Sequence, residues 1–196
     1  MIDPFVLRIE FFEGLVAIDE AIVERAAAEP CRECGGALHR GDHPRKPRGG
    51  LLAMAGEAFS RRFNLCCGQD GCRRRAMPPS VRFLGRRVYL GAVVILAATV
   101  SLAAATSAAA TRTTGVPART TRRWLRWWRG PLTASAPFVE LSARLVPAPE
   151  RQRIPQSLLE RLADERPAAI AKLLAWLAPI TTTSCPDGSR FLRAAM

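Results

Sequence analysis

Residues 31–40, CRECGGALHR, contain the pair of cysteines around which the rest of the chain can be organised. Cys31 and Cys34 stand three positions apart, and Gly35 and Gly36 follow directly. Two thiolates at this spacing can bind one metal ion from a tight turn, and the glycines allow the backbone to fold around the sulfurs. The stretch therefore predicts one half of a four-ligand metal site.

Residues 63–75, FNLCCGQDGCRRR, supply the other half. Cys72 is one predicted ligand, and the spacing allows either Cys66 or Cys67 as the other. Four thiolates are typical of structural Zn²⁺, and two such turns joined by a hairpin form a zinc ribbon. The alternatives are reduced structural thiols, a redox pair, and a histidine ligand in place of one sulfur, from His39 or His43.

The charge is concentrated in the middle of the chain. The formal net charge is +12, and residues 31–130 hold nineteen of the basic residues against only four acids, whereas residues 1–30 are acidic. A concentrated positive field attracts polyanions, above all nucleic acid, with an anionic membrane surface as the competitor. Because Arg is suited to bidentate phosphate binding, we expect phosphate contacts from Arg73, Arg74, Arg75, Arg82, Arg86 and Arg87, with a merely solvated charge run as the alternative.

Residues 113–130, TTGVPARTTRRWLRWWRG, combine tryptophans with arginines. A helix that begins near Pro117 would separate the two kinds of side chain, because one stripe of it at helical spacing is free of arginine. The residues of that stripe are Thr121, Trp124, Leu125 and Trp128. We expect this stripe to pack inward, while Trp127 lies off it.

A short glycine-containing turn at 114–116 links this helix to the Ala-rich stretch before it. Helix, turn and exposed second helix are the plan of a helix-turn-helix, whose second helix enters the major groove of duplex DNA. The expected base contacts come from Arg119 and Arg123, since Arg suits guanine. The expected backbone contacts come from Thr120, Arg122 and Arg126.

The two stretches together resemble a known combination. RRFNLCCGQDGCRRRAMPPSVRFLGRRVYLGAVV followed by GVPARTTRRWLRWWR is similar to the zinc-ribbon and helix-turn-helix regions of bacterial insertion-sequence transposases and related small mobile-element proteins. The resemblance covers roughly residues 31–130. It implies that the 117–129 helix reads DNA and that the metal ligands are Cys31, Cys34, Cys67 and Cys72.

Residues 90–110 are uncharged and long enough for a membrane-spanning helix. They are equally suited to two packed helices with a break between 101 and 107.

Elsewhere we expect a short strand over 4–12, a helix over 15–28, and helices opened by Pro155 and Pro167. The fold class is therefore mainly α with a small β zinc ribbon, a helix-turn-helix and a C-terminal helical pair. The expected divisions are an acidic N-terminal strand and helix at 1–30, the ribbon at 31–87, the helix-turn-helix at 88–130, a Pro-rich linker at 131–153, and the helical pair with its tail at 154–196.

These features predict a zinc-stabilised, non-catalytic protein that binds duplex DNA in transposition or transcriptional control. Only 66 residues follow Gly130, which is too few for an acidic-triad transposase domain. Without a secretory signal pattern at the start, we expect a cytoplasmic, nucleoid-associated chain with reduced thiols. The alternatives are a membrane-anchored protein with its span at 90–110 and a zinc-stapled adaptor that joins other proteins. The apolar stripes within 155–177 would suit a second copy of the chain or another partner protein.

Overall fold

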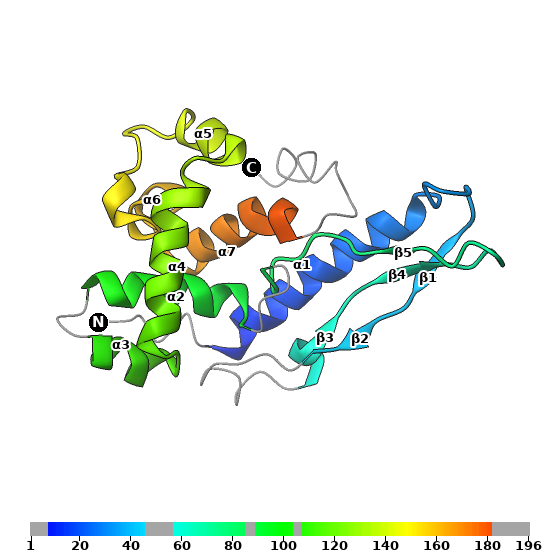
Figure 1. Ribbon diagram of the computed structural model, residues 1–196, viewed down its shortest axis with the longest axis horizontal. Helices are drawn as coiled ribbons and strands as arrows, with labels where there is room; N and C mark the ends of the chain where they lie inside the picture. Colours follow the sequence, from blue (N-terminus) through cyan, green and yellow to red (C-terminus); the bar gives the residue numbers. More distant parts are fainter. Residues whose placement is uncertain (1–7, 46–56, 85–88, 104–106, 182–196) are drawn as a thin grey trace.

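The computed structural model describes residues 8–45, 57–84, 89–103 and 107–181. It is mostly helical with two small antiparallel sheets, which confirms the predicted mainly α class with a small β part (Figure 1). The helices are α1 (Ile9–Ala28), α2 (Gly91–Ala103), α3 (Ser107–Thr114), α4 (Ala118–Trp127), α5 (Ala136–Ser142), α6 (Gln156–Leu162) and α7 (Arg166–Leu177). The strands are β1 (Leu38–Arg40), β2 (His43–Pro44), β3 (Arg61–Arg62), β4 (Leu65–Cys67) and β5 (Arg75–Ala76).

The strands and α1 form an arm at one end of the molecule (Figure 1). One sheet has the order β1-β4-β5, and the other pairs β2 with β3, all antiparallel. The helix α1 packs against the larger sheet, where Val23, Phe63 and Leu65 form a small core of their own. The arm therefore has an apolar interior, but a small one.

Helix α2 lies at the centre of the helical body. Every residue from 91 to 100 is buried, because α2 packs against α3, α4 and α7 together. The described parts of the uncharged stretch at 90–110 lie in α2, which extends to Ala103, and in α3, which begins at Ser107. The residues between these two helices, where the break was expected, lie outside the described residues. No helix in the described ranges is both long and apolar enough to cross a membrane.

The C-terminal helices pack against each other and, through α7, against α2. Pro155 immediately precedes α6, and Pro167 lies in the first turn of α7, as their fixed φ predicts. The apolar residues that suggested a second chain are buried inside this one, and they include Leu158, Leu162, Ile170, Leu173 and Leu177. Between α4 and α6, the stretch expected to be a linker contains a π-helical turn (Trp128–Leu132), α5 and a 3-10 turn (Arg151–Arg153).

The strand expected over 4–12 is wrong for its second half, since Ile9–Phe12 is the first turn of α1, while residues 4–7 lie outside the described residues. In a helix, Phe12 shares a face with Leu15 and Ile22, and all three are buried. Phe12 also makes an edge-to-face contact with Phe59, with ring centroids 5.2 Å apart. Packing on this face explains why the helical conformation prevails over the β pattern of the sequence.

Asp19 lies on the same buried face, and its carboxylate is bound by polar groups of residues 80–82. It accepts hydrogen bonds from Ser80 Oγ (2.5 Å), from the Val81 amide (2.7 Å) and from Arg82 Nε (2.8 Å). Asp19 is 2% exposed and Arg82 is 1% exposed. The Arg82 guanidinium also lies 4.3 Å from the centroid of the Phe63 ring. Arg82, expected to bind phosphate, is thus an internal structural residue.

Asp19→Asn is expected to destabilise the protein by about 3–5 kcal/mol, because the change removes the charge that compensates buried Arg82. Urea unfolding measures the difference. Glu20→Gln is the matched control, since Glu20 is the exposed neighbour on the same helix and its change is expected to stay within about 0.5 kcal/mol. Equal stability of the two variants would show that the pair does not anchor α1.

Candidate functional site: a four-cysteine cluster and a basic helix

Four cysteine sulfurs meet at the tip of the arm. The cluster consists of Cys31, Cys34, Cys67 and Cys72, whose sulfur atoms all lie within 4.8 Å of one another. Two of the separations are 3.8 Å, between Cys31 and Cys72, and 3.4 Å, between Cys34 and Cys67. A tetrahedral ion with bonds of about 2.3 Å to sulfur holds its ligands about 3.8 Å apart. The cluster can therefore hold a metal ion with little rearrangement.

Two turns of similar construction present the sulfurs. In the first, the Gly35 amide donates to the Cys31 carbonyl at 2.7 Å, and Gly35 has φ +72°. In the second, the Cys72 amide donates to the Gln69 carbonyl at 3.1 Å, and Arg73 follows with φ +46°. Arg73 thus adopts the left-handed conformation that glycine adopts in the first turn, at a cost of about 1–2 kcal/mol.

Strand alternation decides which of the two adjacent cysteines joins the cluster. Successive side chains of a strand point to opposite faces, and in β4 both Leu65 and Cys67 are buried while Cys66 is half-exposed. The Cys66 thiol instead donates to the carbonyls of Cys67 and Arg73, at 3.7 and 3.6 Å. Of the two sets of four cysteines that the sequence allows, the structure brings together the set that contains Cys67.

Backbone amides lower the pKa of one of the four thiols. The amides of Glu33 and Cys34 lower the pKa of Cys31 to about 7, because each N–H stabilises the thiolate. The pKa values of the other three thiols are raised. One backbone amide lowers the pKa of each, but neighbouring thiols and burial outweigh it. Four thiols this close cannot all ionise unless a cation compensates their negative charge, and a bound metal ion would supply that cation.

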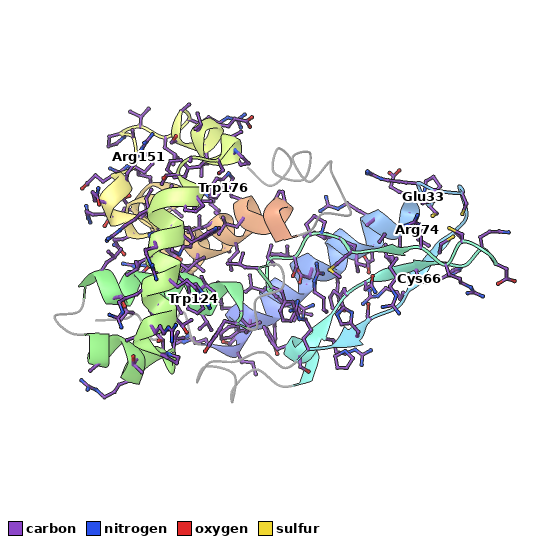
Figure 2. All side chains as sticks on the ribbon, in the orientation of Figure 1. Glu33, Cys66, Arg74, Trp124, Arg151 and Trp176 are labelled. Atoms are coloured by element: carbon purple, nitrogen blue, oxygen red, sulfur yellow. The ribbon has the colours of Figure 1, made fainter. Side chains whose placement is uncertain are left out.

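The arginines that follow Cys72 are paired with acids of the same tip. Arg73 donates to Asp70 at 2.6 Å, and Arg74 lies 3.9 Å from Glu33. Arg75 is exposed on β5, whereas Arg86 and Arg87 lie outside the described residues. Figure 2 shows Glu33, Arg74 and Cys66 together at one end of the long axis, far from Trp124 on α4. Among the described residues, the structure therefore does not bring the expected arginines of the tip together with those of α4.

Helix α4 is fixed by its apolar stripe. Thr121, Trp124 and Trp128 are buried, and Leu125 is half-buried, as the spacing predicts. Trp124 meets Tyr89 edge to face at 5.0 Å. Trp127, which the spacing left unplaced, is half-buried and packs edge to face on Trp128 at 5.1 Å. One side of α4 is thus held rigidly against the helical body.

The opposite side of α4 is basic. We call this the α4 basic face; it comprises five exposed arginines, four on α4 and the last in the π-helical turn that follows: Arg119, Arg122, Arg123, Arg126 and Arg129. Within the described part of the chain, no acidic side chain forms an ion pair with any of them. Thr120 is half-buried beside them. An open hollow of about 690 Å³ lies along this face.

The connection from α3 to α4 is short and tightly specified. Gly115 has φ +64°, and its amide donates to the Thr111 carbonyl at 2.8 Å, which closes the end of α3. Val116 follows and is fully buried, and Pro117 precedes the first residue of α4. The three helices α2, α3 and α4 all contact one another.

Comparisons with protein-family models, with curated proteins and with solved structures found no match to this chain. The site is therefore interpreted from its own chemistry.

Cys67→Ser is expected to abolish binding of one metal ion per chain, because it removes a sulfur from the cluster. Cys66→Ser, the change at the adjacent position, is expected to leave metal content unchanged. Substitution of the metal by Co²⁺ gives a thiolate charge-transfer absorption that reports four sulfur ligands directly. Loss of that absorption in the Cys66 variant, or its retention in the Cys67 variant, would contradict the assignment of the ligands.

Proposed function

We propose that this protein binds duplex DNA through the basic face of α4 and that the cysteine cluster is a structural Zn²⁺ site of the zinc-ribbon type. The observation that carries the proposal is the arrangement of five exposed arginines on one side of a helix whose other side is buried. A basic patch fixed on a rigid element binds polyanions with little further loss of entropy. The proposed role is transposition-associated or transcriptional, without catalysis.

The turn of residues 115–117 supports α4 as the helix that enters the major groove. A glycine with positive φ, a buried apolar residue and the start of a second helix are what a helix-turn-helix requires of its turn. Arg123 and Thr120 lie in the first turns of α4, the part of a recognition helix that reaches base edges. We therefore assign base contacts to this end of the helix.

The donor set of the cluster favours zinc in a structural role. Four thiolates close the tetrahedral shell and leave no open position for a substrate, which is typical of sites that stabilise a fold. Bound Zn²⁺ would join the two turns that the sequence separates by more than thirty residues, and the small apolar core of the arm needs such a link.

The thiolates also change the role proposed for the nearby arginines. Four thiolates around one divalent ion leave a net negative charge, and Arg73 and Arg74 lie beside it in addition to their acidic partners. Their positive charge is thus largely offset within the arm. We propose that they act first as counter-charges of the metal centre and contribute secondary phosphate contacts at most.

DNA affinity is expected to fall steeply with salt, with a slope of log K against log[salt] of about −3 or steeper. On a duplex selected from random sequence, Arg123→Ala is expected to cost about 1–3 kcal/mol and to reduce the preference over unselected DNA. Arg25→Ala is the matched control, since it removes the same charge from an exposed position on α1. Fluorescence anisotropy measures both.

Binding that does not respond to salt, or that is absent altogether in zinc-loaded protein, would contradict the proposal. The second outcome would favour the adaptor alternative, which needs the metal but not the nucleic acid.

A further inference from the structure

The hollow on α4 involves only part of the basic face. Its lining arginines are Arg119, Arg122, Arg126 and Arg129, with Leu125 and Gly130 completing it. Spacings of three, four and three residues place these four arginines on one stripe of the helix. Arg123, the fifth arginine of the basic face, does not line the hollow. The face therefore has two parts with different surroundings.

The shape of the hollow fits a polymer of phosphates better than a single anion. From Arg119 to Arg129 the stripe covers ten residue steps, or about 15 Å of helix. A DNA strand offers a phosphate about every 3.4 Å along its axis. Leu125 is half-buried and contributes an apolar surface between the charged side chains. A Cβ added to Gly130 would meet no atom within 4 Å, so the end of the hollow is open.

We infer that the stripe of Arg119, Arg122, Arg126 and Arg129 binds the phosphodiester backbone of one strand of the duplex, and that base edges are left to Arg123 and Thr120. This inference rests on the proposed function and refines it. It moves Arg119 from the base contacts expected from the sequence to the backbone contacts, because Arg119 lines the same hollow as Arg122 and Arg126.

Gly130 offers a test that removes no contact. Gly130→Glu places a negative charge in the open end of the hollow, and Gly130→Gln adds a side chain of nearly the same shape without the charge. The Glu variant is expected to bind the selected duplex and unselected DNA about tenfold more weakly than the Gln variant, by the same factor on both.

Arg126→Ala supplies the second measurement. It is expected to weaken binding to both duplexes equally and to make the salt slope shallower by about 1, whereas Arg123→Ala changes the ratio between the duplexes. Equal affinity of the two Gly130 variants, or an Arg126 variant that changes the ratio instead of the slope, would overturn the inference while leaving DNA binding intact. Failure of the unmodified, zinc-loaded protein to bind DNA would instead refute the proposed function.

Discussion

The carboxylate of Asp19 ties the arm to the helical body. It stands on α1, which covers the larger sheet, and it accepts hydrogen bonds from three consecutive residues, 80–82. A buried charge is tolerated only where a partner and hydrogen bonds replace the water it has lost, so α1 has one favoured position against this segment. Phe12 and Leu15, on the same face of α1, then join the core that surrounds α2. The cysteine cluster at one end and α4 at the other are thereby held in one framework.

The two ends differ in how their positive charge is compensated. At the tip of the arm, Asp70 and Glu33 form ion pairs with Arg73 and Arg74 next to the four cysteines, so part of the positive charge is compensated within the tip. On α4 the arginines face solvent, and the tryptophans on the opposite side of the helix are buried against the helical body. Arginine number alone therefore does not locate a binding surface. Among the described residues, the arginines of the α4 basic face form no ion pair, and this is the surface that we propose for a polyanion.

Much of the site could be predicted from spacing, because the chemistry itself fixes the spacing. Two cysteine pairs with short internal loops predict a shared metal, and the stripe containing Trp124 predicts the buried side of α4. The choice between Cys66 and Cys67 could not be made from the sequence, since it depends on the alternation and register of β4, a strand of three residues.

The errors share one physical cause, which is pairing over long sequence distances. Asp19 lies four residues after Leu15 and three before Ile22, a spacing that places it on the apolar stripe. An acid at that position indicates a buried basic partner, but the sequence does not show which of the 27 arginines is that partner. Arg82 therefore looked like part of the phosphate-binding run. The first turn of α1 was predicted as a strand because its apolar run fits both conformations until the position of Phe59 is known.

The central claim is that DNA contacts the basic face of α4, at the opposite end from the four-cysteine cluster. Titration of ¹⁵N-labelled, zinc-loaded protein with a duplex, followed by NMR of the backbone amides and arginine Nε–H groups, tests it most directly. The signals of residues 118–130 are predicted to shift first and most strongly, with those of residues 66–76 changing little. Shifts centred on residues 66–76, with those of α4 unaffected, would contradict the claim.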